Sequence, residues 1–254
     1  MSIINKIFER LKGEKIIRSE KDQNKVLTLT KGPDGLSVKF NGITYSRIAP
    51  NRIFTGSYWD YFTPLPLLFE KPEILMIGLG GGTIVHQLIK LYGKKTKMDV
   101  VEIDPKMVEL SKDFIGKDIN KINLLIDDGI KFLRRNDKKY NLLFLDAYDS
   151  DKIPDEFLEE ETIENMDKAL TEYGVLAINY AMSFKAIVFL QNYINKLKKH
   201  FKVYLVNNPL GSGNTILICS KKMDKKEILS KVDKMKKNKE NMHVIKGYEN
   251  MSNG

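Results

Sequence analysis

The sequence predicts an α/β fold built on a mostly parallel sheet of seven strands, with a small antiparallel β domain in front of it. Three observations lead to this prediction. Apolar runs alternate with amphipathic segments from Pro72 onward, a glycine-rich turn follows the first apolar run, and the last two apolar runs have no helix between them. Strands buried on both faces appear as continuous apolar runs, and their alternation with helices indicates parallel βαβ units.

The N-terminal region is expected to form a helix and a small antiparallel sheet. Residues 2–12 place apolar side chains on one helical face, and alternating apolar segments follow within residues 14–50. Asn41 and Gly42 lie between two of these segments, and Asn-Gly in that place is a strong hairpin signal. We assign residues 1–62 to an N-terminal helix and small β-sheet domain. Its strands are expected at 25–30, 36–40 and 43–48.

Residues 63–221 are expected to form a Rossmann-like α/β domain. The expected strands are 73–78, 98–104, 122–126, 140–146, 174–179, 202–206 and 214–220. The expected helices are 82–92, 105–115, 129–135, 155–170 and 183–200. Because no helix separates the last two strands, the final strand is expected to be antiparallel and inserted beside the sixth. That ending is typical of nucleoside-dependent transferases and unusual for a dehydrogenase that binds a dinucleotide.

Residues 222–254 are expected to form a basic C-terminal helix and tail. The chain has a net charge of +9, and residues 221–240 contain nine lysines and four acidic residues. Arginine is scarce there and no aromatic residue is placed to stack on a base, so nucleic-acid binding is an unlikely function. An amphipathic helix is the simpler interpretation, with its apolar side formed by Ile228, Leu229, Val232 and Met235.

The composition indicates a cytoplasmic protein without membrane segments. No run of 18 apolar residues occurs, and the N-terminus carries charges among its apolar residues and lacks the features of a signal peptide. The single cysteine, Cys219, excludes an intramolecular disulfide, which fits a reducing compartment. No paired-histidine motif occurs, so no metal is expected as a cofactor.

A nucleoside site is predicted where the first three parallel strands end. The turn after the first strand contains four glycines, which let the backbone turn sharply and let a ligand approach it closely. These are Gly78, Gly80, Gly81 and Gly82. The second strand ends in Glu102 and Ile103, where an acid can bind both ribose hydroxyls. The third ends in Asp127, Asp128 and Gly129, where a carboxylate can accept a hydrogen bond from an adenine amino group.

An NAD site would share the glycine turn and the ribose-binding acid. A dehydrogenase of this type also needs a residue that relays a proton during hydride transfer, commonly from a Tyr/Lys or His/Asp pair. The three histidines, His86, His200 and His243, are expected on helices or in the tail, where a surface position is more common than a catalytic one. Together with the paired terminal strands, this favours an S-adenosyl ligand over NAD.

A cluster of acidic residues follows the fourth parallel strand. Ten acidic residues and one lysine, Lys152, lie between Asp146 and Asp167. Asp146 and Asp149 stand at the carboxyl edge of the sheet, where ligands bind in open α/β folds. A carboxylate there can hold an ammonium group, orient it and accept its proton, so we predict Asp146 and Asp149 as catalytic residues. The remaining acids, from Asp155 onward, are expected to begin a surface helix, where they suit the helix dipole.

With these residues identified, residues 14–221 resemble the polyamine aminopropyltransferase (spermidine synthase) family. The family's motifs "IGGGDGG", "VEID", "GDG" and "DSSDP" correspond to "IGLGGGT", "VEID", "DDG" and "DAYDS" in this chain. The resemblance implies that Glu102 binds ribose, Asp128 binds adenine, and Asp146 lies beside the transferred group. Asp146 is therefore also counted among the residues that bind the donor. Substrate-binding positions are expected at Tyr58, Asp60, Tyr148, Asn179 and Asn208.

The chain departs from the family pattern mainly where the acceptor is expected. Gly81 stands at the position of the acceptor-binding aspartate of the glycine loop, and Asn179 replaces a glutamine. Asn208 replaces a tyrosine, and Ser150 replaces a proline. The nucleoside half is kept, whereas much of the half that holds the polyamine differs, so the resemblance implies a non-standard amine acceptor.

The leading hypothesis is a spermidine synthase-like aminopropyltransferase that uses decarboxylated S-adenosylmethionine. The alternative is a methyltransferase that uses S-adenosylmethionine on the same fold. A third hypothesis, based on the basic tail, is a non-catalytic protein that binds nucleosides or nucleic acid. The expected partner is a small amine substrate, and the resemblance also suggests a homo-oligomer, either a dimer or a tetramer.

Overall fold

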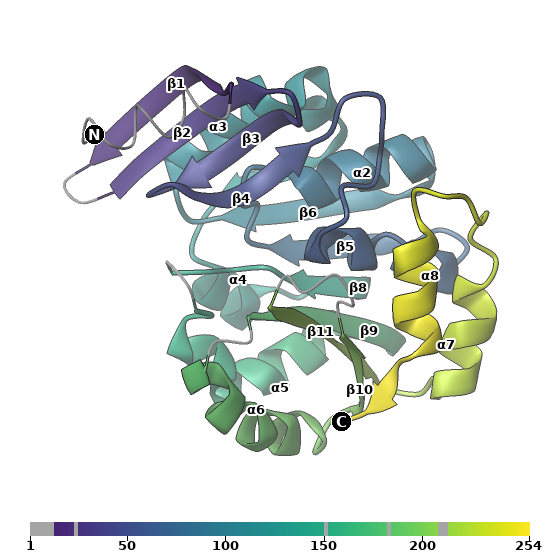
Figure 1. The fold of residues 1–254 in the computed structure, drawn as a ribbon. Helices are drawn as coiled ribbons and strands as arrows, with labels where there is room; N and C mark the ends of the chain where they lie inside the picture. Colours follow the sequence, from purple (N-terminus) through teal and green to yellow (C-terminus); the bar gives the residue numbers. More distant parts are fainter. Residues whose placement is uncertain (1–12, 23–24, 150–151, 182–183, 208–212) are drawn as a thin grey trace.

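The computed structural model describes residues 13–22, 25–149, 152–181, 184–207 and 213–254. They form a four-stranded antiparallel sheet and an eight-stranded mixed sheet flanked by helices (Figure 1). The predicted α/β fold is therefore confirmed. The helix expected at residues 2–12 lies outside the described residues.

The smaller sheet has strands in the order β1-β2-β3-β4. Their bounds are β1 (Lys15–Asp22), β2 (Lys25–Gly32), β3 (Gly35–Phe40) and β4 (Ile43–Ile48). The expected Asn-Gly hairpin is present: Phe40 pairs with Ile43, and both turn residues have positive φ, 48° at Asn41 and 87° at Gly42. The first of the four strands was not among those predicted individually, although it lies within the predicted sheet.

The larger sheet has the order β12-β10-β11-β9-β8-β5-β6-β7. Its strands are β5 (Glu73–Ile77), β6 (Lys97–Glu102), β7 (Asn123–Ile126), β8 (Tyr140–Leu145), β9 (Leu170–Ala181), β10 (Lys202–Asn207), β11 (Asn214–Ser220) and β12 (Ser252–Asn253). The strands β5 to β9 pair in parallel, whereas β11 runs antiparallel between β9 and β10, as the absence of a helix before it predicted. The eighth strand, β12, adds two residues at the edge beside β10.

Helices cover both faces of the larger sheet (Figure 1). On one face lie α2 (Thr83–Tyr92) and α3 (Pro105–Ile115). On the other lie α4 (Gly129–Arg135), α5 (Glu160–Ala169) and α6 (Phe184–Leu197). Alternate residues of each strand enter opposite cores: in β5, Ile74 and Met76 join the first and Leu75 and Ile77 the second. This two-sided burial explains why the parallel strands are continuous apolar runs.

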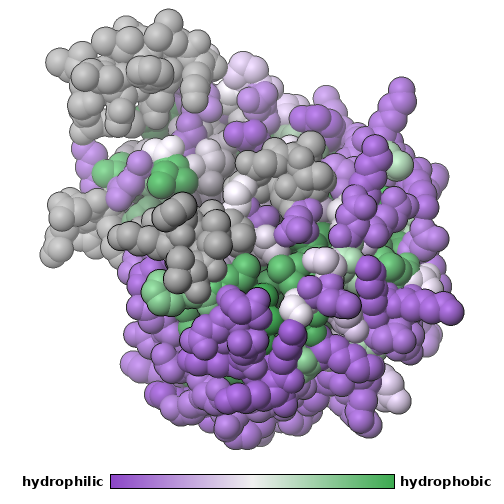
Figure 2. All heavy atoms as spheres, turned by 60° about the horizontal axis from the view of Figure 1, so that its bottom comes forward, coloured by the Kyte–Doolittle hydropathy of each residue, from purple (hydrophilic) through white to green (hydrophobic). Residues whose placement is uncertain are grey.

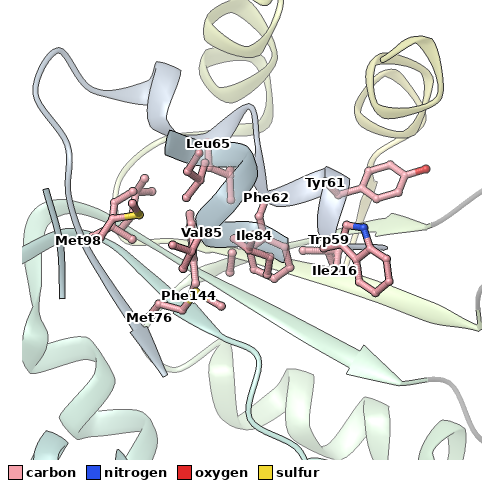
Figure 3. Close-up of a cluster of buried hydrophobic side chains, with 14 of the residues drawn as sticks. Trp59, Tyr61, Phe62, Leu65, Met76, Ile84, Val85, Met98, Phe144 and Ile216 are labelled. Carbon is pink, nitrogen blue, oxygen red and sulfur yellow. The ribbon is translucent and has the colours of Figure 1, made fainter. Parts of the chain in front are cut away.

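Residues 222–254, which were expected to form a basic helix and tail, pack onto the core that α2 and α3 also cover. This segment contains α7 (Lys225–Val232), α8 (Met242–Glu249) and β12, and its apolar residues are buried. They are Ile228, Val232, Met235, Val244, Ile245, Tyr248 and Met251. Two short 3-10 helices lie beside this segment: α8 contacts η1 (Tyr58–Phe62), and α7 contacts η2 (Leu65–Leu68). Figure 3 shows the η1 aromatic residues Trp59, Tyr61 and Phe62 within the same cluster as Phe144 of β8 and Ile216 of β11.

The face that carries α5 and α6 is largely hydrophilic (Figure 2). The acid-rich stretch lies on this side of the molecule and forms two elements. These are a short 3-10 helix, η5 (Asp155–Leu158), and the first turn of α5, which begins with Glu160 and Glu161. Among the described residues, no helix is long and apolar enough to cross a membrane.

Candidate active site

A cavity of about 680 Å³ opens at the carboxyl ends of the parallel strands. Its volume is in the range of small-ligand pockets. The loops after β5, β6, β7 and β8 form its floor, and the β3–β4 hairpin of the smaller sheet forms a side wall. The residues from that wall are Phe40, Ile43, Thr44 and Tyr45. The small N-terminal sheet thus contributes directly to the site.

The glycine turn after β5 has a conformation that other residues rarely adopt. Gly78 has φ of 89°, and a Cβ there would lie 2.4 Å from the carbonyl oxygen of Asp146. The end of β5 can therefore approach the end of β8 closely only with glycine at this position. Gly78 and Gly80 line the cavity. Gly81 and Gly82 do not, although both were predicted to contact the cofactor.

Gly81 instead packs against the smaller sheet. Its φ is 111°, and a Cβ there would lie 2.9 Å from Cβ of Ser46 in β4. The hydroxyl of Ser46 donates to the carbonyl of Gly80 over 2.7 Å, and Thr83 exchanges hydrogen bonds with the backbone of Arg47. The side chain of Ser46 thus occupies the space next to Gly81. This contact joins the glycine turn to the wall of the cavity.

Glu102 at the end of β6 is buried behind the glycine turn. Its two carboxylate oxygens accept hydrogen bonds from the backbone amides of Leu79, over 2.8 Å, and Asp104, over 2.9 Å. Withdrawal from water raises the pKa of this carboxyl, and the backbone amides act in the opposite direction. Ile103, predicted beside it, is 67% exposed and lines the cavity.

The end of β7 contributes Asp127, Asp128 and Gly129 to the cavity wall. One oxygen of Asp128 accepts from the amides of Ile130 and Lys131, so this residue is the N-cap of α4. Asp127 pairs with Arg135 at the far end of the same helix. All three predicted residues therefore meet at one edge of the site.

Asp146 stands at the base of the cavity, directly after β8. Its Oδ1 accepts a hydrogen bond from the side-chain amide of Asn179 over 2.8 Å, and the Tyr58 hydroxyl faces the same carboxylate from the cavity wall. Burial raises the pKa of Asp146 to about 7, and the charge of Glu102 acts in the same direction. The hydrogen bonds from Asn179 and Tyr58 oppose this rise. A carboxyl group with this pKa can gain or lose a proton near neutral pH.

Amide and hydroxyl groups continue from Asp146 along the next strands. Asn179 in β9 accepts at its Oδ1 from the side chain of Asn214 in β11, over 2.8 Å. The Tyr148 hydroxyl donates to the backbone carbonyl of Asn179, also over 2.8 Å. Asp149 lies farther out, exposed at the cavity wall. The structure therefore brings Tyr58, Asp146, Tyr148, Asp149 and Asn179 together, as expected of a substrate-binding region.

The two remaining predicted substrate-binding residues are Asn208 and Asp60. Asn208 lies outside the described residues. Asp60 is fully buried and away from the cavity wall, where its carboxylate accepts hydrogen bonds from the backbone amides of Thr55 and Gly56. The prediction that Asp60 contacts substrate is corrected for this reason.

Several cavity residues were not predicted from the sequence. Asn214 begins the antiparallel strand, and its role depends on the pairing of β11 with β9, which motif reading does not reveal. Three acids assigned to the surface helix and the segment before it, Glu156, Glu159 and Glu161, line the cavity as well. Among the described residues, the wall contains nine carboxyl groups and two basic side chains, Lys131 and Arg134. The described residues contain no group of three or more His, Cys, Asp or Glu arranged to hold a metal ion.

The sequence model of the spermine/spermidine synthase domain matches residues 57–231. A polyamine aminopropyltransferase from Clostridium botulinum is 31% identical over 181 residues, which cover 66% of this chain and 63% of the relative. The enzyme of that name from Prochlorococcus marinus is 25% identical over 203 residues, covering 76% and 70%. That from Methanocaldococcus jannaschii is 30% identical over 149 residues, covering 56% and 50%. The matched regions thus span between half and seven tenths of these relatives.

Solved structures share the fold at lower sequence identity. The spermidine synthase from Thermotoga maritima superposes with a TM-score of 0.69 at 22% identity, covering 90% of this chain and 82% of its own. A spermidine synthase in complex with the transition-state analogue AdoDATO gives 0.70, also at 22% identity, with 90% and 83% covered. Human methyltransferase-like protein 13 in complex with SAH gives 0.56 at 22% identity, with 75% and 88% covered. The fold is therefore that of methyltransferase-like proteins.

Proposed function

This chain belongs to the spermine/spermidine synthase family, and from that premise we propose that it transfers an aminopropyl group from decarboxylated S-adenosylmethionine to an amine. The observation that carries the proposal is Asp146, which sits at the base of an acid-lined cavity with a pKa of about 7. The names of the curated relatives support this activity, and the complex of a related fold with AdoDATO supports the donor.

The cavity divides into two parts with different chemistry. Glu102, whose carboxylate lies behind the glycine turn, is proposed to bind the ribose hydroxyls, and Asp127 and Asp128 are proposed to bind the adenine. Asp146 then faces the sulfonium end of the donor. Tyr148 and Asn179 extend from Asp146 toward the acceptor, and Asp149 anchors the acceptor's ammonium group farther out.

The reaction is a displacement at the carbon next to the sulfonium. The amine nitrogen must first lose a proton, because ammonium groups have pKa values near 10. Its lone pair then forms the new C–N bond, the C–S bond breaks, and the electron pair leaves with methylthioadenosine. The proton passes to a carboxylate of the Asp146–Asp149 region, which acts as a general base. Holding the nucleophile in line with the C–S bond lowers the barrier further.

The acceptor is proposed to be a non-standard amine. Gly81 offers no side chain to the acceptor, and the side chain of Ser46 fills the space beside it. Around Asp146, the groups supplied by β9 and β11 are the neutral amides of Asn179 and Asn214.

The test is to incubate the protein with decarboxylated S-adenosylmethionine and a panel of mono-, di- and triamines, and to measure methylthioadenosine by chromatography. Amine-dependent formation of methylthioadenosine, lost in Asp146→Asn, is the expected result.

The altered acceptor region and the methyltransferase-like fold favour one second candidate, methyl transfer from S-adenosylmethionine. Formation of S-adenosylhomocysteine with a methylated amine would establish it. Formation of neither thioether nucleoside would contradict both.

The proposal also includes a cytoplasmic location and a homo-oligomer of two or four chains. The single cysteine, Cys219, is fully buried, which is compatible with a reducing compartment. Light scattering coupled to gel filtration measures the assembly. A monomer at micromolar concentration would contradict this part of the proposal and leave the proposed chemistry unaffected.

A further inference from the structure

We propose that His243 in α8 is a positioning residue of the active site, which acts through Asp60 to hold the Tyr58 hydroxyl against Asp146. The effect on catalysis rests on the proposed function, whereas the effect on Asp146 itself does not. The α8 helix, which lies beyond residues 57–231 that match the family model, would then be a working part of the site.

The first step of the argument is the environment of Asp60. Its Oδ2 accepts from the Gly56 amide over 2.7 Å and lies 2.8 Å from Nε2 of His243. Its Oδ1 accepts from the side chains of Thr55, over 3.2 Å, and Gln87, over 2.5 Å. The Asp60 side chain is 0% exposed and that of His243 13%. Among the described contacts of this carboxylate, His243 is the partner that can carry a positive charge.

The second step is the path from Asp60 to Tyr58. Asp60 lies two residues after Tyr58, and its carboxylate reaches back to Thr55 and Gly56, which precede Tyr58. The amide of Asp60 also donates to the carbonyl of Ser57 over 3.1 Å. The carboxylate thus closes a tight turn around Tyr58. Tyr58 is the first residue of η1 and lines the cavity together with Asp146, so the position of its hydroxyl relative to Asp146 depends on this turn.

The third step is the attachment of α8. Tyr248 donates to the backbone carbonyl of Tyr61 over 2.7 Å, and Gly247 lies so close to the Tyr61 ring that a Cβ would come within 2.4 Å. The His243 ring meets Phe54 and Tyr61 edge-on. Figure 1 shows α8 beside the sheet, and Figure 3 shows Tyr61 at the edge of the aromatic cluster of η1. The ring contacts of His243 and the close approach of Gly247 therefore hold α8 beside η1 in addition to the Tyr248 hydrogen bond.

Loss of the His243 donor would leave a buried carboxylate oxygen short of one hydrogen bond. A buried acceptor left without its partner loses its stabilisation, so the turn is expected to rearrange. The Tyr58 hydroxyl would then move away from Asp146. The groups that face Asp146 are Tyr58, Asn179, Glu102 and Tyr148. The Tyr58 hydroxyl and the Asn179 amide lower the pKa of Asp146. Its titration should therefore shift to higher pH.

The experiment compares His243→Phe, His243→Gln, Tyr58→Phe and Tyr248→Phe with the wild type. The pKa of Asp146 is measured without substrate by carboxyl carbon NMR, with the resonance assigned through Asp146→Asn. We expect Tyr58→Phe and His243→Phe to raise this pKa together, by about half a unit to one unit. Gln places an amide donor near the site of Nε2, so His243→Gln should restore the wild-type value. Tyr248→Phe, the control in the same helix, should lower the melting temperature without moving the titration.

Kinetic measurements on the same variants connect the effect to function. The acid limb of kcat/KM should move with the pKa of Asp146, and kcat of His243→Phe should fall about tenfold at neutral pH. An unshifted Asp146 titration in His243→Phe, alongside a shifted one in Tyr58→Phe, would show that His243 only stabilises the fold and would overturn the inference. An inactive wild type with shifted NMR titrations would instead contradict the proposed function.

Discussion

Asp146 is subject to opposite demands from folding and from chemistry. Its pKa of about 7 in the folded protein lies far above the value of about 3.9 for an unfolded aspartate, so the folded state binds the proton more tightly. The contribution of Asp146 to the free energy of unfolding should then be largest below about pH 4 and be lost as the pH rises through 7. Asp146→Asn removes this cost and should stabilise the protein at pH 8 by about 1–2 kcal/mol. Its kcat should fall by about a hundredfold or more.

Urea unfolding at pH 4 and at pH 8 measures this difference. The stabilisation should disappear at pH 4, where both proteins are neutral at residue 146. Asp155→Asn is the matched control, because Asp155 pairs with Lys152 at the surface with its side chain 72% exposed. That control should change the free energy of unfolding by less than about 0.5 kcal/mol at either pH. An Asp146→Asn variant that is less stable at pH 8 would show that the charged carboxylate supports the fold.

The cavity carboxylates at the ends of the parallel strands could be predicted from the sequence because each lies within two residues of the end of its strand. Glu102, Asp128 and Asp146 end parallel strands, and parallel strands meet at one edge of a sheet. The role of Asp60 could not be found in this way. Its partner His243 lies 183 residues away, and a contact over that distance leaves no local periodicity or motif. From the sequence alone, an aspartate near a predicted substrate-binding tyrosine can either contact the ligand or be buried and hold the local backbone by hydrogen bonds.

At the scale of the element, the glycine turn is constrained on both sides. Gly81→Ala would place a methyl group 2.9 Å from Ser46 at a φ of 111°, so both the contact and the backbone are unfavourable. We expect a loss of about 2–4 kcal/mol in the free energy of unfolding. Gly93 is the matched control, because its φ is also positive, at 57°, and a Cβ there meets nothing within 4 Å. Gly93→Ala should cost about 1 kcal/mol.

Chemical denaturation of the two variants separates the contact from the backbone conformation. The double variant Ser46→Gly with Gly81→Ala should recover part of the loss, because the nearest side-chain atoms are removed. Equal losses in Gly81→Ala and Gly93→Ala would mean that the contact with β4 contributes nothing. In that case the junction between the smaller sheet and the glycine turn would not stabilise the cavity wall.

Elements with strong local patterns were predicted well, and those defined by their partners were not. The helix α2 and the strand β8 are read from periodicity and from a continuous apolar run, and both are present. By contrast, β12 has two residues and exists because Leu205 and Tyr204 of β10 offer an open edge. In α8, the buried side of the helix is defined by η1, an element with no regular pattern of its own. The composition of residues 222–254 therefore could not distinguish β12 and α8 from an unstructured tail.

At the scale of the whole molecule, the charge of the chain and the charge of its cavity have opposite signs. The net charge is +9, but nine carboxyl groups and two basic side chains line the cavity. A cationic amine should therefore be repelled by the molecule at long range and attracted at the cavity. Salt screens both interactions between exposed charges, over about 10 Å at 0.1 M, and the attraction is expected to dominate near the site.

The salt dependence of substrate recognition tests this balance. The KM for the amine should rise about three- to tenfold between about 0.02 M and 0.5 M sodium chloride, because the cavity's attraction is screened. Methylthioadenosine is the matched probe, since it occupies the nucleoside half without a net charge. Its inhibition constant should change less than about twofold over the same range. A parallel weakening of both would point to a general effect of salt on the protein. A KM for the amine that falls with salt would mean instead that repulsion by the basic surface outweighs the carboxylates of the cavity.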